Sequence, residues 1–184
     1  MNGKPHLIIP DADVVIDLHA LGLWDSFVEK NNVYLADTVV GEARFYPVGR
    51  MQFSSDPNNT YIPKNPVDLT DDIDSGKITI IALNASDMIP LLQEAQKMGA
   101  HDRIHPGEEE TLAAVFTTHP ELTLCFKDRG AVECAVLVGL KDKCISVECA
   151  LQQCGLGRKL AYGLSEKRFR RIVKAAEQER VQKL

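Results

Sequence analysis

The sequence lacks any uninterrupted apolar run of about 18 or more residues, which is the length that a membrane-spanning helix needs. The N-terminal segment MNGKPHLIIP has too short an apolar stretch for a signal-peptide core and has no small-residue cleavage site. We therefore expect a cytoplasmic protein with no membrane association. With 184 residues, 45% hydrophobic and 26% charged, the chain suits a single globular domain.

Motifs for several cofactors are also missing. The sequence contains no G-x-G-x-x-G or Walker sequence, so we expect no nucleotide cofactor. Its odd number of cysteines forms no C-x-x-C pair and argues against a disulfide framework: Cys125, Cys134, Cys144, Cys149 and Cys154. The first three lie in apolar segments, which favours core packing over zinc binding. The histidines His101, His105 and His119 lack ligand spacing and are interpreted as surface or loop residues.

Positive charge is scarce except at the C-terminus. The formal net charge is −5, but residues 158–184 carry nine Lys or Arg against three Glu and are therefore at +6, which leaves −11 for residues 1–157. A stripe of Phe169, Ile172, Val173 and Ala176 at helical spacing predicts one buried face in this basic helical tail. The opposite face suits solvent, a nucleic-acid backbone or a partner chain, and the sequence does not choose between them.

Short apolar runs alternate with helical patterns. Strands are predicted at residues 6–10, 33–36, 77–83, 122–126 and 144–147. Helices are predicted over residues 14–28, 37–46, 86–98, 107–119 and 129–138, with a final pair of helices after the last strand. Residues 47–76 hold four of the nine prolines and are interpreted as a long loop or flap. This alternation indicates an α/β fold with a central parallel sheet covered on both faces.

Acidic residues follow the predicted strand ends. Asp11 ends the first strand, Glu42 lies in the helix after the second, Glu108 opens the helix after a Pro-Gly break, and Asp128 follows the strand at 122–126. Active sites of parallel α/β sheets form beyond the carboxyl ends of the strands, so these four carboxylates are expected to converge. Such crowding is tolerable only with a bound cation.

Hard divalent ions fit that donor set. Mg²⁺ and Mn²⁺ take oxygen ligands and keep several waters, which leaves room for a substrate phosphate. These ions support hydrolysis of a phosphodiester without a cysteine or histidine nucleophile. Asp11, Glu42, Glu108 and Asp128 are therefore the candidate metal ligands and catalytic residues. Asp13 is interpreted as the cap of the first helix, with a further ligand as the alternative, and Glu110 as either an outer-shell group or part of a solvated helix face.

Three segments carry a family resemblance: IIPDADVVIDL, VYLADTVVGEARF, and GEEETLAAV followed by LTLCFKDRGAVECA. Over residues 6–150 the chain resembles the PIN-domain (VapC-like) nuclease family, and Asp11, Glu42, Glu108 and Asp128 fall on the acidic positions of that family. The resemblance implies a three-layer α/β/α PIN-like domain over residues 1–157, followed by the basic tail at 158–184.

The same resemblance implies a function. PIN domains are in the main Mg²⁺- or Mn²⁺-dependent ribonucleases, and many bacterial ones are toxins paired with an antitoxin. It therefore implies an endoribonuclease with an RNA substrate, an antitoxin partner as one biological role, and a homodimer. Related bacterial sequences often carry Asp-Asp where this chain has Lys127-Asp128, and the lysine would either lower metal affinity or contact a phosphate. The alternative is a PIN-fold module that binds RNA or protein without cutting.

Overall fold

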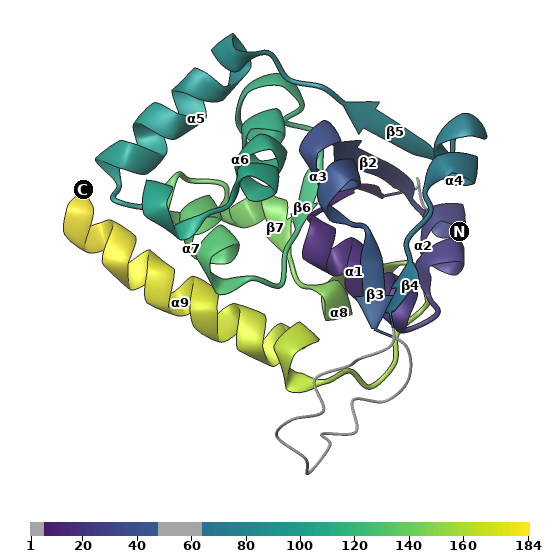
Figure 1. Ribbon diagram of the computed structural model, residues 1–184. Coiled ribbons are helices and arrows are strands. Elements are labelled where there is room, and N and C mark those ends of the chain that lie inside the picture. The colour runs from purple at the N-terminus through teal and green to yellow at the C-terminus, as the bar shows by residue number, and fades with distance from the viewer. Residues whose placement is uncertain (1–5, 48–63) are drawn as a thin grey trace, which may run out of the picture.

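The computed structural model describes residues 6–47 and 64–184 (Figure 1). Its centre is a five-stranded sheet in the order β5-β2-β1-β6-β7, and every neighbouring pair in this sheet is parallel. The strands are β1 (Leu7–Pro10), β2 (Asn32–Ala36), β5 (Ile78–Ile81), β6 (Thr123–Cys125) and β7 (Cys144–Ile145). Short strands of buried β-branched and apolar residues are typical of a parallel sheet that is covered on both faces.

Helices cover the two faces of the sheet. Successive strand residues point to opposite faces, so Ile8 and Ile9 belong to two different hydrophobic clusters. Ile9 packs in the cluster built by α5 (Ala85–Lys97), α6 (Pro106–Ala113), α7 (Arg129–Leu137) and α9 (Glu166–Lys183). Ile8 packs in the cluster built by α1 (Ala12–Ala20), α2 (Trp24–Lys30), α3 (Asp37–Glu42) and α8 (Val147–Gln153). The α/β class and the parallel central sheet are thereby confirmed, with helices in layers on both sides.

Two predicted helices are shorter than expected. The helix predicted over residues 14–28 is divided into α1 and α2, because Gly22 adopts a positive φ of 65° that ends the first helix. The helix predicted to reach residue 46 ends at Glu42, since Phe45–Pro47 forms strand β3 instead. The predicted helix at 107–119 is α6 continued by a π-helical segment, Ala114–Thr118.

The range 47–76 contains more regular structure than a loop. Strand β4 (Lys64–Pro66) pairs antiparallel with β3, and helix α4 (Thr70–Asp74) follows it. Trp24 Nε1 donates a hydrogen bond to Asp72 Oδ2 at 2.9 Å, which attaches α4 to α2. The remaining part of the predicted flap, residues 48–63, lies outside the described residues.

The basic C-terminal segment is part of the same core. Helix α9 runs beside α7 along one edge of the molecule (Figure 1). Its predicted apolar stripe is confirmed, because Ile172 and Ala176 are buried and Phe169 and Val173 pack against the same cluster. The tail therefore joins the folded body rather than extending from it. Among the helices of residues 6–47 and 64–184, none is both long and apolar enough to cross a bilayer.

Candidate functional site: a cavity lined by carboxylates

All four candidate carboxylates line one open cavity of about 290 Å³ at the carboxyl ends of the strands, together with Ala12, Asp13 and His105. Strands β1 and β6 are neighbours in which Pro10 pairs with Cys125, so Asp11 and Asp128 leave the sheet at the same edge. Glu42 reaches the cavity from the end of α3, and Glu108 reaches it from the first turn of α6. Four segments far apart in the sequence thus meet at one place.

Asp11 is the most buried of the four, with 2% of its surface exposed. It caps α1, because Val14 N–H donates to Asp11 Oδ1 at 2.8 Å. Its Oδ2 is buried and has no hydrogen-bond partner among the described residues. Burial holds the pKa of Asp11 well above its usual range, and the nearby charges of Asp13 and Glu108 raise it further, although the Val14 N–H and Lys127 oppose the shift. An unpartnered buried carboxylate oxygen in an acidic cavity is a position suited to a cation.

Glu108 belongs to a capping arrangement at the start of α6. Its Oε2 accepts a hydrogen bond from the backbone N–H of His105 at 2.9 Å, while the His105 side chain accepts from the backbone of Glu108. Burial raises the pKa of Glu108, and the charges of Asp128 and Asp13 act in the same direction. The cap fixes the backbone that carries this carboxylate, and the raised pKa of Glu108 reflects its burial first and the neighbouring negative charges second.

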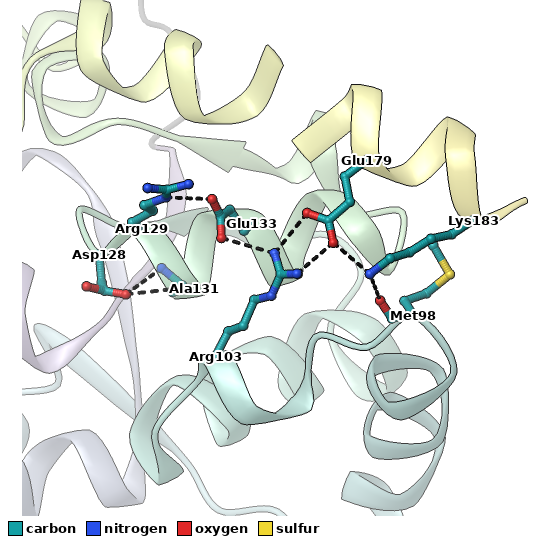
Figure 2. Close-up of polar contacts among 9 residues, drawn as sticks. Met98, Arg103, Asp128, Arg129, Ala131, Glu133, Glu179 and Lys183 are labelled. Carbon is teal, nitrogen blue, oxygen red and sulfur yellow. Dashed lines mark hydrogen bonds and ion pairs between the residues drawn. The ribbon is translucent and has the colours of Figure 1, made fainter. Parts of the chain in front are cut away.

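Asp128 caps α7 in a similar way. Its Oδ1 accepts from Gly130 N–H at 2.6 Å and from Ala131 N–H at 3.4 Å, as Figure 2 shows for Ala131. Only Oδ1 takes part in these bonds. The capping role and the cavity-lining role therefore coexist in one carboxylate, as they do in Asp11.

Glu42 has a different support. It is exposed, and its carboxylate lies directly against Gly107, where an added Cβ would overlap Glu42 Oε2. Glycine at 107 thus allows α3 and α6 to approach closely enough for Glu42 and Glu108 to line the same cavity.

Two acidic residues next to Glu108 have other tasks. Glu110 is buried and accepts hydrogen bonds from the backbone N–H groups of Thr38 at 2.8 Å and Leu83 at 3.5 Å. It therefore ties α6 to the start of α3, the helix that carries Glu42, and is not part of a solvated face. Glu109 is half-buried, and its Oε1 lies 3.6 Å from His101 Nε2.

Lys127 points toward α1. Its Nζ lies 2.6 Å from Asp17 Oδ2 and 3.4 Å from Asp13 Oδ2. The two carboxylates raise the pKa of Lys127 against the opposing effect of burial, so the side chain stays charged. The expectation that Asp13 caps the first helix is wrong, because Asp11 takes that position and Asp13 instead lines the cavity and pairs with Lys127.

His105 is a site residue that sequence spacing missed. The sequence predicts a surface or loop residue, and His105 is indeed exposed, yet it lines the cavity and begins the α6 capping arrangement. The signal that could have found it is its position three residues before Glu108, the spacing of a capping box.

The expected core packing of Cys125, Cys134 and Cys144 is confirmed, since all three are buried.

The donor chemistry of the cavity fits a hard divalent ion. Its charged lining consists of carboxylates, with one histidine, and the Asp11 oxygen without a partner offers a ligand atom. In the part of the chain that the structure describes, however, no three Asp, Glu, His or Cys side chains lie close enough to hold one ion together. Mg²⁺ and Mn²⁺ need only one or two direct carboxylates and fill the remaining positions with water, so the cavity meets that smaller requirement.

Comparisons with known proteins add no assignment. No protein-family model matches this chain, and no curated protein matches it either.

Proposed function

We propose that this chain is a PIN-like, divalent-metal-dependent endoribonuclease whose site is the cavity lined by Asp11, Glu42, Glu108 and Asp128. The observation that carries the proposal is Asp11 Oδ2, a buried carboxylate oxygen that has no hydrogen-bond partner in the described part of the chain, in a cavity lined by three further candidate carboxylates. A bare acidic cavity of this kind repels a phosphodiester, whereas the same cavity with a divalent cation attracts one.

Each residue has a defined task in this proposal. Asp11 and Asp128 each have one carboxylate oxygen that takes no part in their capping bonds, and Glu108 and Glu42 line the same cavity. Mg²⁺ or Mn²⁺, when bound, supplies Lewis-acid stabilisation of the charge that develops in phosphodiester hydrolysis. Lys127 pairs with Asp17 and with the cavity-lining Asp13, and its positive charge partly offsets the negative charge that a phosphate meets there.

A second candidate is a PIN-fold module that binds RNA or protein without cutting. It is favoured by the lack of any three close ligands among the described residues, and by the lysine at position 127. The ribonuclease proposal is preferred because a binding module has no need for four carboxylates around one cavity. An antitoxin partner and a homodimer belong to the same PIN-like proposal and depend on it.

Cleavage of a mixed RNA pool tests the proposal. The wild type, Asp11→Asn and Asp142→Asn are compared in Mn²⁺, in Mg²⁺ and in EDTA. We expect the wild type and Asp142→Asn to cut with either metal and not in EDTA, because Asp142 is exposed and outside the cavity lining. Asp11→Asn keeps the helix cap but removes the carboxylate, and is expected to be inactive. Metal-dependent cleavage by Asp11→Asn would contradict the assignment of the site.

A further inference from the structure

A second cavity of about 430 Å³ opens where α7, α9 and the short helix η4 (Tyr162–Leu164) meet. Its lining includes Arg129, Arg168 and Arg171, with Tyr162, Glu133 and Ile172. We call this cavity the arginine groove. It is the opposite of the carboxylate cavity in charge, and the proposed chemistry of the carboxylate cavity makes no use of it.

The negative charge in the arginine groove is already neutralised. Glu133 Oε1 accepts from Arg129 Nε at 2.6 Å, and Glu133 Oε2 accepts from Arg103 at 3.1 Å. Figure 2 shows this carboxylate between the two guanidinium groups, with Arg103 bonded in turn to Glu179 of α9. The single acid of the groove is thus engaged by two arginines, and a net positive charge faces the solvent.

The arginines differ in how firmly they are held. Arg168 donates to the backbone carbonyls of Lys127 and Gly163, which fixes it between the end of β6 and η4. Arg171 is exposed, and its side chain makes no hydrogen bond or ion pair within residues 6–47 and 64–184. An exposed guanidinium without a partner, beside one that is already positioned, is suited to binding an anion such as a phosphate.

An aromatic surface completes the groove. Tyr162 lines it and is 54% exposed, so its ring is accessible from solvent. Aromatic rings next to basic side chains are the combination with which proteins bind unpaired nucleotides, because the ring stacks on a base while the cation meets the backbone.

Consecutive residues of the chain line the carboxylate cavity and the arginine groove. Asp128 lines the first cavity and the next residue, Arg129, lines the second. Arg168 also bonds to the carbonyl of Lys127, directly before Asp128. We propose that the groove holds a backbone phosphate and an unpaired base of the single-stranded RNA whose cleaved bond lies in the carboxylate cavity. This assignment of a substrate subsite rests on the proposed ribonuclease function.

Binding without cleavage tests the groove separately from the chemistry. Each groove variant is made in the Asp11→Asn background, and its affinity for a short labelled single-stranded RNA is measured in EDTA at several salt concentrations. Lys174→Ala is the matched control, because Lys174 is an exposed cation of the same helix that lies outside the groove lining. Unchanged melting temperatures establish that the variants remain folded.

Arg171→Ala is expected to weaken binding and to make the slope of log affinity against log salt shallower by about 0.7, the value for one phosphate contact on a single strand. Tyr162→Ala is expected to weaken binding about 5-fold or more, while Tyr162→Phe retains the affinity because it retains the ring. In the catalytically intact background, Arg171→Ala should raise KM and leave kcat unchanged.

Three results would overturn the groove assignment: no RNA binding, equal losses from Arg171→Ala and Lys174→Ala, or competition by an acidic peptide as strong as that by unlabelled RNA. The last would identify the groove as a site for a partner protein. Specific RNA binding in a protein that never cleaves would instead retain the groove and reject the ribonuclease.

Discussion

Among single side chains, Asp11 and Asp128 each combine a structural task with a place in the cavity. Each caps a helix through Oδ1 and lines the cavity. The cap can be kept by asparagine, which is as good a capping residue as aspartate. Asparagine variants therefore separate the charge of these residues from their contribution to the fold.

The buried charge of Asp11 predicts a gain in stability on its removal. Its raised pKa means that the ionised form costs free energy in the folded state, about 1.4 kcal/mol for each pKa unit. Without metal at neutral pH, Asp11→Asn should therefore raise the free energy of unfolding above that of the wild type. Urea unfolding in EDTA measures this value, with Asp142→Asn as an exposed control that should not change. A loss of stability in Asp11→Asn would show that the carboxylate is structural.

Gly107 provides a second test at this scale. Gly107→Ala places a Cβ where the Glu42 carboxylate lies, and the exposed Glu42 side chain can move away at little cost to the fold. We expect cleavage to fall by about 10-fold or more, because displacing a ligand by about 1 Å is enough for such losses. Gly41→Ala is the matched control, since that position opens onto free space beside the same glutamate. Equal activity in both variants would exclude Glu42 from the reaction.

At the scale of elements, a network of ion pairs and hydrogen bonds holds α9 against the rest of the fold. Glu179 accepts hydrogen bonds from Arg103 at 2.6 and 3.0 Å and pairs with Lys183 at 2.6 Å, and Lys183 also reaches the Met98 carbonyl (Figure 2). The Arg103 and Lys183 contacts lower the pKa of Glu179 to about 2. The network of ion pairs continues from Arg103 through Glu133 to Arg129. The position of α9 is therefore coupled to α7, the helix that Asp128 caps.

This network predicts a specific loss of stability in acid. The folded state keeps Glu179 ionised to about pH 2, whereas the unfolded chain protonates it near the ordinary pKa of 4.5. The unfolded state therefore binds more protons in this window, and the stabilisation present above it is lost as the pH falls. Glu179→Gln should lower the free energy of unfolding at neutral pH and much less at about pH 3.

Urea unfolding at the two pH values measures the effect. The control is Glu177→Gln on the same helix, because Glu177 forms its ion pair with the exposed Lys141 at the surface. An equal loss at both pH values in Glu179→Gln would contradict the assigned role of the ion pairs.

For the whole molecule, the sequence predicted the layers better than the details of the site. Alternating apolar strands and helices specified the parallel sheet, and strand ends located Asp11 and Asp128. The division of the first helix at Gly22 and the pairing of β3 with β4 depend on backbone conformation and on contacts across the chain, which apolar spacing does not encode. The roles of Asp13 and His105 were missed for a similar reason, because a capping position is decided by the φ and ψ of one residue.

The meeting of the carboxylates in one cavity is also a property of the whole fold. Glu42 and Glu108 reach one cavity only because Gly107 lets α3 approach α6, and because Glu110 ties α6 to the backbone of Thr38. No local pattern contains this information, although the strand-end rule indicates which edge of the sheet is involved.

The dependence of RNA cleavage on Mn²⁺ concentration tests the central claim most directly. One defined single-stranded RNA is cut by the wild type and by Asp128→Asn over a range of Mn²⁺ concentrations. The carboxylate-cavity account predicts a saturable dependence in the wild type and a half-saturating concentration about 10-fold or more higher in Asp128→Asn, since changes even in the outer shell of a metal site cost that much. An identical Mn²⁺ dependence in the two proteins, or cleavage that persists in EDTA, would contradict it.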